Sequence, residues 1–308
     1  MSRVCALPTI TDDSALGGAV IERSFRFNRG SSTHLAYTPS SASSDRTKVT
    51  ISAWVKKCDF NEGEYSIFHA GTTSNDRAQL RFYTSSGFDN ISFFARTSGT
   101  FILQLDTTAK FRDTTGWYHI VARCDTTNGT ANIYVNGEEL TDFTTSTKPS
   151  GSQAMEFFNN SEHQIGERGY DGSGTYFDGY MTEINVIQGQ ALDASYFGYT
   201  EFQTGIWRPK KYTGSYGDGF YLNFSTLGET ATTMGRDYSG NGNNFTPQNL
   251  EISDFSLDTP TNNFCTINDQ NHNDNNLLTH GNLYTDANSG TWRPVSSTMA
   301  MSSGRWYW

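Results

Sequence analysis

The chain has 308 residues, a formal net charge of −10 at pH 7 and a sequence pI near 5.0. An acidic chain is poorly suited to a phosphate backbone, whose binding requires Lys and Arg to release counterions, so nucleic acid is excluded as a partner. No apolar run approaches the roughly 18 residues of a membrane helix, and residues 1–13 lack the apolar region of a secretory signal, so we predict a soluble protein made in the cytoplasm without membrane insertion.

The composition favours an all-β fold. Aromatic residues make up 14% of the chain and charged residues 18%, with 21 Phe and 16 Tyr, while Gly, Ser, Thr and Asn are plentiful. Each buried aromatic ring removes about 150–250 Å² from water, so a few rings can stabilise a thin sandwich core. The polar small residues are typical of turns and strands rather than helices. The length allows two domains, at roughly 150 residues per domain.

The first 105 residues contain a tail followed by regularly spaced strand signals. Residues 1–19 show no periodicity, which fits either a disordered tail or an arm that docks on a partner. Strand patterns follow, separated by turn residues and mostly about ten to twelve residues apart, at 24–28, 34–37, 49–56, 65–70, 78–83, 90–95 and 100–105. This spacing indicates a sandwich rather than alternating strands and helices.

Residues 114–140 predict an antiparallel meander. Tyr118, Ile120 and Ala122 alternate with His119 and Arg123, as in a half-buried strand. A polar turn at 125–129 leads to a second strand at 131–135, and Asn136-Gly137 is a pair that tolerates positive φ in a tight turn. A hairpin with one apolar face is not stable alone, so a second sheet must cover it.

Further strand signals occur at 154–158, 164–166 and 176–187, and 192–197 predicts a short helical turn. From about residue 198 the pattern changes, and 207–212 predicts an extended connector because Pro209 lacks an N–H donor. Four cysteines lie far apart at positions 5, 58, 124 and 265 without metal-ligand spacing, and we expect free thiols with Cys58 and Cys124 buried.

The motif Gly-Trp-Tyr-His-Ile-Val-Ala at 116–122, with Ile-Tyr-Val-Asn-Gly at 133–137, resembles the core of laminin-G-like, concanavalin A-like jelly-roll domains. The runs at 24–28, 34–39 and 49–56 resemble the opening strands of such domains in bacteriophage tail and appendage proteins. The run at 177–187 resembles their closing strand, where Thr182 replaces the usual Asp, which puts any ion held by that carboxylate in doubt. The resemblance spans residues 20–200 and implies an antiparallel jelly-roll β-sandwich.

The remainder resembles parts of other sandwiches. The Leu-x-Phe run at 222–224 with Asp-x-Ser-Gly-Asn-Gly at 237–242 looks like the opening hairpin of a further laminin-G-like sandwich, or these residues pair with a neighbouring sheet edge. Residues 258–308 resemble the entry to a SPRY-type domain that stops in its first long strand, which implies a longer natural protein. The expected division is an arm and virion anchor at 1–19, the sandwich at 20–200, an extended connector with a β-hairpin at 201–257, and an incomplete second β domain at 258–308.

A catalytic function has little support in the sequence. Glucanases on this fold resemble one another in a Glu-x-Asp-x-Glu strand that places an acid and a nucleophile about 5–5.5 Å apart, and no such run occurs. Glu62 and Glu64 lie in a turn with no third acid at the required spacing, and the six His residues show no zinc spacing. A Ser-His-Asp triad stays open, although no Gly-x-Ser-x-Gly elbow is present. We predict that the protein is not an enzyme.

Two sets of loop residues are candidate binding sites. Asp76, Asp171 and Asp178 are candidate calcium ligands, because calcium prefers oxygen ligands and the resemblance implies an ion at a loop rim; Asp before Gly is also ordinary turn chemistry. Phe88, Tyr170 and Tyr176 are candidate glycan-binding residues, since a sugar requires an apolar ring beside hydrogen-bonding groups; exposed aromatics also serve protein interfaces.

The resemblance implies a structural virion protein of a bacteriophage, a tail fibre, appendage or head fibre that uses a lectin-like sandwich for host adhesion or assembly. Its expected partners are other virion proteins, further copies of itself and a host-surface glycan, and its expected location is the virion after synthesis in the host cytoplasm. The alternative is a carbohydrate-binding module of a glycan-degrading or secreted protein. Fold alone does not decide between these functions.

Overall fold

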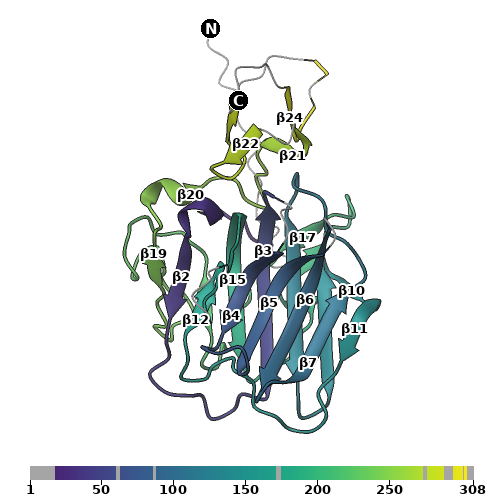
Figure 1. Ribbon diagram of the computed structural model, residues 1–308, viewed down its shortest axis with the longest axis vertical. Coiled ribbons are helices and arrows are strands. Elements are labelled where there is room, and N and C mark those ends of the chain that lie inside the picture. Colours follow the sequence, from purple (N-terminus) through teal and green to yellow (C-terminus); the bar gives the residue numbers. More distant parts are fainter. Residues whose placement is uncertain are drawn as a thin grey trace.

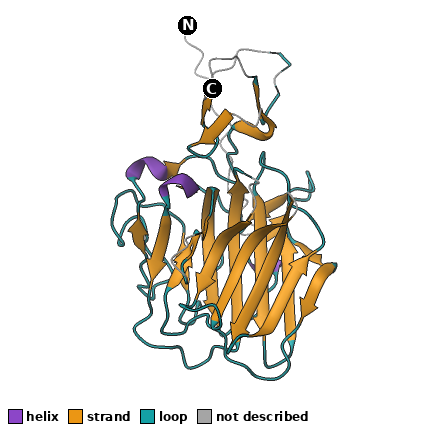
Figure 2. Ribbon diagram, viewed as in Figure 1, coloured by secondary structure: helices purple, strands orange, loops and turns teal. Residues whose placement is uncertain are grey.

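The computed structural model describes residues 18–59, 63–85, 88–170, 175–272, 276–287, 294–300 and 302–303. Its regular structure is almost entirely β-strand (Figure 2), which confirms the all-β prediction. The helical elements of the described residues are the 3₁₀ turns η1 (Arg29–Ser31), η2 (Ala194–Tyr196) and η3 (Ile252–Asp254). The predicted turn at 192–197 is η2, whose cap is the Asp193 carboxylate accepting the Ser195 N–H. Among the described residues, no helix has the length and hydrophobicity needed to cross a bilayer.

Two eight-stranded antiparallel sheets form the sandwich. The first sheet runs in the order β10 (Glu138–Leu140), β9 (Thr130–Val135), β8 (Tyr118–Asp125), β3 (Lys48–Lys57), β15 (Gly179–Gln188), β1 (Ser24–Phe27) and β20 (Phe255–Ser256), with β18 (Phe220–Leu222) also paired to β15. The second runs in the order β11 (Phe143–Thr147), β7 (Thr100–Thr107), β6 (Phe88–Thr97), β5 (Arg77–Ser85), β4 (Gly63–Ala70), β12 (His163–Ile165), β2 (His34–Tyr37) and β19 (Thr246–Gln248).

Four two-stranded antiparallel ribbons complete the described structure. They are β13 (Glu167–Arg168) with β14 (Thr175–Tyr176), β16 (Gly198–Thr200) with β17 (Trp207–Pro209), β21 (Ile267–His272) with β24 (Val295–Ser297), and β22 (Asn276–Thr279) with β23 (Tyr284–Ala287). Figure 1 shows the ribbons of β21 to β24 above one end of the sandwich rather than within either sheet.

The main core lies between the two sheets, because alternate side chains of each strand point inward. In β3 these are Val49, Ile51, Ala53 and Val55, all fully buried. They meet inward residues of β5, β6 and β7 from the opposite sheet, such as Leu80, Phe93 and Leu103. The two sheets therefore cover each other's apolar faces, as expected for hairpins that have one apolar face each.

The predicted meander is confirmed. β8 pairs with β9 and β9 with β10, and Ile120 and Ala122 of β8 point into the core while His119 points away from it. Asn136 and Gly137, which join β9 to β10, have φ values of 50° and 86°. An Asn-Gly pair adopts this left-handed conformation at little cost, so the turn follows directly from the sequence.

The segment after residue 200 adds strands to both sheets. β18 pairs with β15, β19 pairs with the edge strand β2, and β20 pairs with β1. Of the two alternatives for residues 220–248, pairing with an existing sheet edge is the arrangement that the structure shows. The division of the chain into four regions remains a prediction.

Residues that follow β15 also cover the outer face of the first sheet. A second buried cluster forms there from Val121 and Tyr134 of the sheet and from Ala194, Phe197 and Tyr212 of the covering segment. Cys58 and Cys124 are free and buried, as predicted. Thr182, at the position of the expected Asp, donates a hydrogen bond to the Arg23 carbonyl (2.7 Å).

Candidate functional site

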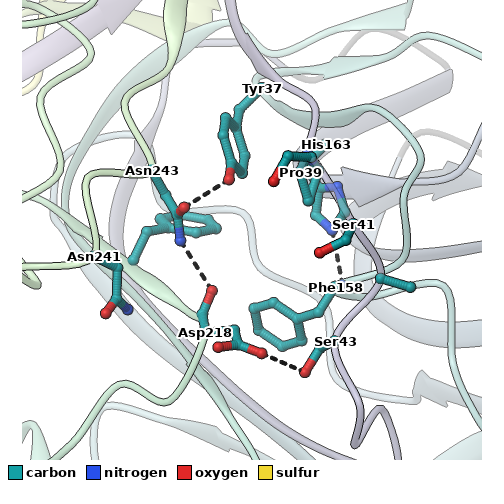
Figure 3. A pocket seen from close by; sticks show the side chains of 12 residues that line it. Tyr37, Pro39, Ser41, Ser43, Phe158, His163, Asp218, Asn241 and Asn243 are labelled. Atoms are coloured by element: carbon teal, nitrogen blue, oxygen red, sulfur yellow. Dashed lines mark hydrogen bonds between the residues drawn. The ribbon is translucent and has the colours of Figure 1, made fainter.

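A cavity of about 260 Å³, here called the rim pocket, opens where three distant segments meet at the edge of the second sheet. Its walls are the end of β2 with the following loop, the loop before β12, and the residues around the start of β18 with the turn that follows it; they are Tyr37, Pro39, Ser40, Ser41, Ala42, Ser43, Phe158, His163, Asp218, Phe220, Asn241 and Asn243. Figure 3 shows these side chains converging on the cavity.

The turn at 237–244 is built around the buried carboxylate of Asp237. One oxygen accepts hydrogen bonds from the N–H groups of Tyr221 (2.9 Å) and Ser239 (2.8 Å), and the other accepts from the N–H of Asn243 (2.9 Å). Gly240 and Gly242 supply φ values of 96° and 75°, which let the backbone wrap around this one acceptor. The Asp-x-Ser-Gly-Asn-Gly sequence therefore encodes a rigid turn that presents two asparagine side chains.

These asparagines connect the turn to the neighbouring loop. The Asn243 amide donates to the carbonyl oxygens of Asp218 and Gly219 (both 2.9 Å), and Asn241 donates to those of Gly217 and Gly219 (both 2.8 Å). The Tyr37 hydroxyl donates to the Asn243 side-chain oxygen at 2.6 Å (Figure 3), so an aromatic ring is fixed beside the amides. Burial, together with the negative charge of Asp237 and Asp218, raises the pKa of Tyr37 and keeps it protonated.

Asp218 provides an acceptor at the mouth of the rim pocket. One carboxylate oxygen accepts a hydrogen bond from the Ser43 hydroxyl at 2.6 Å, while the second oxygen makes no hydrogen bond to a described residue. The Asp218 residue is exposed, as is Asn241. The pocket thus combines a carboxylate, amides and hydroxyls with the buried ring of Phe158 and the half-buried ring of Tyr37.

Ser43, His163 and Asp218 all line this pocket, but they do not form a nucleophilic relay. The His163 Nε2 accepts the Phe158 N–H (2.8 Å), so Nδ1 carries the proton and donates to the Ser161 carbonyl (2.8 Å). Burial lowers the pKa of His163 to about 4, which keeps the ring neutral. Since both ring nitrogens bond to backbone groups and Ser43 bonds to Asp218, no base is available to take the serine proton.

The aromatic residues proposed from the sequence lie elsewhere. Tyr170 follows β13 and Tyr176 belongs to β14, so both are on one hairpin. The guanidinium groups of Arg77 and Arg168 lie 4.1 and 4.8 Å from the Tyr170 ring centroid, and a sugar would compete with them for this ring. Phe88 begins β6, and its side chain lies outside the described residues. None of the three lines the rim pocket.

The carboxylates proposed as calcium ligands have different neighbours. Asp76 accepts a hydrogen bond from the Ser98 N–H (2.7 Å), whereas Asp178 accepts from the Arg29 N–H (3.3 Å). Asp171 lies outside the described residues. Within the described ranges, no three His, Cys, Asp or Glu side chains form a group suited to a metal ion. The calcium site remains a prediction.

Glu183 is an unusual titratable group that sequence reasoning did not single out. It lies at a β-bulge in β15 with a φ of 50°, a conformation that is strained for a residue with a side chain. Its carboxylate accepts the Tyr221 hydroxyl at 2.6 Å. Burial raises the pKa of Glu183 from 4.5 to about 7, although Tyr221 and Lys211 act in the opposite direction. The strand repeat gives no signal of this, because the bulge is a register shift in the pairing of β15 with the distant strand β3.

The rim pocket itself was not predicted, although one of its signals was visible. The Asp-x-Ser-Gly-Asn-Gly motif predicts a hairpin, but the sequence does not identify its partner, because Tyr37 and Asn243 are 206 positions apart. The local pattern identifies the turn. The turn lies beside Tyr37 because β18 pairs with β15 and β19 pairs with β2.

Residues 29–195, more than half of the chain, match the family described as the concanavalin A-like lectin/glucanases superfamily. A comparison with curated proteins gives no match. Among solved structures, the chain is similar to a pentraxin of Limulus polyphemus (18% identity, TM-score 0.40, covering 56% of this chain and 80% of that one). It is also similar to a protein described as carbohydrate-binding from Bacteroides ovatus (16% identity, TM-score 0.49, covering 77% of this chain and 60% of that one). A third similar structure is the enzymatically active domain of tailspike protein 2 of bacteriophage CBA120 (16% identity, TM-score 0.42, covering 61% of this chain and 28% of that one). The chain thus spans less than two thirds of the last two.

Proposed function

Because this chain belongs to the concanavalin A-like lectin/glucanases superfamily, we propose that its sandwich is a glycan-binding module and that the rim pocket is its sugar site. The observation that carries the proposal is that two acceptors, the second carboxylate oxygen of Asp218 and the side-chain oxygen of Asn241, lie with the ring of Tyr37 around one pocket and make no hydrogen bond to a described residue. Asn243 fixes the Tyr37 ring by accepting its hydroxyl. Sugar hydroxyls can donate to these acceptors, and the C–H face of a sugar can pack on the apolar Tyr37 ring.

The geometry favours a neutral sugar in this pocket. Asp218 has a carboxylate oxygen free of bonds to described residues, and the pocket lining contains no Lys or Arg to neutralise an anionic ligand. The hydrogen bonds that hold Tyr37 and Asn243 already exist without ligand, so binding would cost little side-chain entropy.

Glycan binding by the full chain tests this proposal. We expect Asp218→Ala to weaken the affinity for the best ligand of a glycan array by about tenfold or more, since a hydrogen bond to a charged group contributes about 1.5–3 kcal/mol. Asp142→Ala is the matched control, because Asp142 is exposed and does not line the pocket. Equal affinities for the two variants, measured by calorimetry, would place the sugar elsewhere.

We further propose that the module belongs to a bacteriophage virion protein, a tail fibre, appendage or head fibre, that acts in host adhesion or assembly. The support is the resemblance of the runs at 24–28, 34–39 and 49–56 to the opening strands of phage appendage domains. Other virion proteins and further copies of this chain are the proposed partners, and residues 1–19 the proposed anchor. Deletion of residues 1–18 should leave a folded sandwich that no longer joins particles; normal incorporation refutes the anchor.

The alternative is a carbohydrate-binding module of a glycan-degrading or secreted protein, and it draws equal support from the lectin-like fold. Copy number per particle separates the two, because a virion component co-purifies with particles at a fixed ratio and a secreted module does not. The regions 201–257 and 258–308, proposed as a connector with a β-hairpin and a SPRY-like β domain, are tested by limited proteolysis, which should cut near their boundaries.

Calcium binding by Asp76, Asp171 and Asp178 is proposed separately. Calcium should raise the melting temperature of the chain, and Asp178→Asn should remove this effect, because a ligand that binds only the folded state stabilises it. A melting temperature that is unchanged by calcium and by chelator excludes the site.

A further inference from the structure

A second cavity lies on the outer face of the first sheet and does not share a residue with the rim pocket. Its volume is about 670 Å³, within the range of roughly 300–1,000 Å³ that is usual for ligand sites. It is called the tryptophan groove because Trp54, Trp117 and Trp207, all the tryptophans of the described residues, line it.

The aromatic walls of this groove are held rigidly. The His119 ring lies between Trp54 and Trp207, with centroid distances of 4.7 and 6.0 Å and an interplanar angle of 23° to each. The Trp207 indole N–H donates to His119 Nδ1 (2.9 Å), so Nε2 carries the proton and donates to the Ser52 hydroxyl (2.9 Å). Burial lowers the pKa of His119 to about 3, which keeps this stack uncharged at neutral pH.

Trp117 is fixed independently of the stack. Its indole N–H donates to Asp258 at 2.9 Å, and the same carboxylate pairs with the fully buried Lys56 at 2.8 Å. The indole N–H groups of Trp117 and Trp207 are therefore already satisfied. These two indoles offer the groove ring surface rather than hydrogen-bond donors.

Polar groups with spare capacity lie beside the rings. Asn136 and Glu138 are both exposed. The Asn136 side-chain oxygen accepts the backbone N–H of His119 (2.8 Å). The Asn136 side-chain N–H₂ and the Glu138 carboxylate make no hydrogen bond to a described residue. Arg208 is paired with Glu201 at 3.1 Å, so the lining residues offer no unpaired cation. One amide donor and one carboxylate acceptor beside apolar rings match the hydroxyls and the C–H face of a sugar, whereas an anionic ligand would be repelled by Glu138.

We propose that the tryptophan groove binds a neutral oligosaccharide, with its sugar rings against the tryptophan surfaces and hydroxyls on Asn136 and Glu138. This rests on the proposed glycan-binding function and assigns to it a second, larger site. The rigid walls mean that little side-chain freedom is lost on binding. The two sites together would let one module contact a glycan chain at separate places, which raises the effective affinity for a surface.

Titration of the full chain with maltotetraose, cellotetraose, xylotetraose and chitotetraose, followed by tryptophan fluorescence and calorimetry, tests the proposal. At least one of these probes should change the emission. Glu138→Ala should weaken its binding about tenfold or more, and Ile206→Arg should abolish it by filling the groove from its half-exposed edge. Glu139→Ala, an exposed neighbour outside the groove, is the control and should bind normally.

The rim-pocket variant Asp218→Ala separates the two proposals. Binding that survives Asp218→Ala but not Glu138→Ala or Ile206→Arg supports the groove. Binding that survives both groove variants and is lost in Asp218→Ala overturns the groove and leaves the rim pocket as the sugar site. Unchanged fluorescence with all four probes also overturns the groove, as does an emission change that depends on protein concentration alone, which would identify a second copy of the chain as the occupant.

Discussion

Replacing Glu183 by Gln should stabilise the protein at alkaline pH and have little effect at acid pH. Burial raises the pKa of this carboxyl from 4.5 to about 7, so between these values the folded state binds more protons than the unfolded state. The contribution of Glu183 to the free energy of unfolding is therefore fully present below about pH 4.5, where the carboxyl is protonated in both states. It is lost as the pH rises through about 7, where the buried carboxyl ionises. The glutamine side chain of this variant would stay neutral throughout and could still accept the Tyr221 hydroxyl.

The size of the effect follows from the pKa. A rise from 4.5 to about 7 corresponds to about 3 kcal/mol, an upper value because Glu183 is partly exposed and water screens its charge. With a urea dependence of roughly 3 kcal/mol per M, Glu183→Gln should raise the unfolding midpoint by up to about 1 M at pH 8 and by almost nothing at pH 4.5.

Urea unfolding followed by near-UV circular dichroism at both pH values measures this difference directly. The buried histidines titrate equally in both proteins, so their contribution cancels in the comparison. Glu22→Gln is the control, because Glu22 and Glu183 line one cavity but the Glu22 side chain is 72% exposed. A Glu183→Gln protein that gains no stability at pH 8, or gains the same amount at both pH values, would refute the assigned burial cost.

Three other changes test the packing. Gly137→Ala should destabilise the fold by about 2–4 kcal/mol in urea unfolding, because a Cβ there would overlap the Trp207 indole, whereas Gly151→Ala, with a similar φ of 85° and open space around it, should cost only about 1 kcal/mol; equal losses would contradict the overlap. Lys56→Met should cost about 3–5 kcal/mol by leaving Asp258 buried without its cation, and adding Asp258→Leu should recover much of this loss; additive losses would show that the pair is not coupled. Cys58 and Cys124 should not react with a thiol reagent at pH 8 until the chain unfolds, since burial raises the pKa of Cys124 to about 12 and that of Cys58 well above its usual value; rapid labelling would show that the core opens.

The sandwich was predictable because its long strands carry their own signal. β3 and β15 each have ten residues, so alternation between faces repeats several times, and Asn136-Gly137 fixes one of the turns locally. Strands β18 and β19 have three residues each, too few for any periodicity to be read. Their existence depends on unpaired N–H and C=O groups of β15 and β2, which are properties of the assembled sheets and not of residues 220–248.

The candidate sites were hidden for the same reason. Phe88, Tyr170 and Tyr176 stay predicted glycan-binding residues, but aromatic residues near polar loops occur in many chains, so this pattern alone does not locate a site. A candidate site is distinguished by which distant segments of the chain meet in the fold. Trp54, His119 and Trp207 form one stack from three separate parts of the chain, and β3 gives no sign that the outward Trp54 will be only 5% exposed.

In both the rim pocket and the tryptophan groove, one wall is formed by residues that follow the part of the chain matching the family. The family match ends at residue 195, whereas the rim pocket uses Asp218 and Asn243 and the tryptophan groove uses Trp207 and Asn263. These residues lie in segments that add short strands to the sheets or cover the outer face of the first sheet. The jelly roll thus supplies positions such as Tyr37 and Trp54, and the later segments supply the remaining groups of the two proposed sites. The proposed function therefore predicts that glycan preference, measured on a glycan array, follows residues 196–264 when this segment is exchanged between related chains; a preference that stays with residues 29–195 would contradict it.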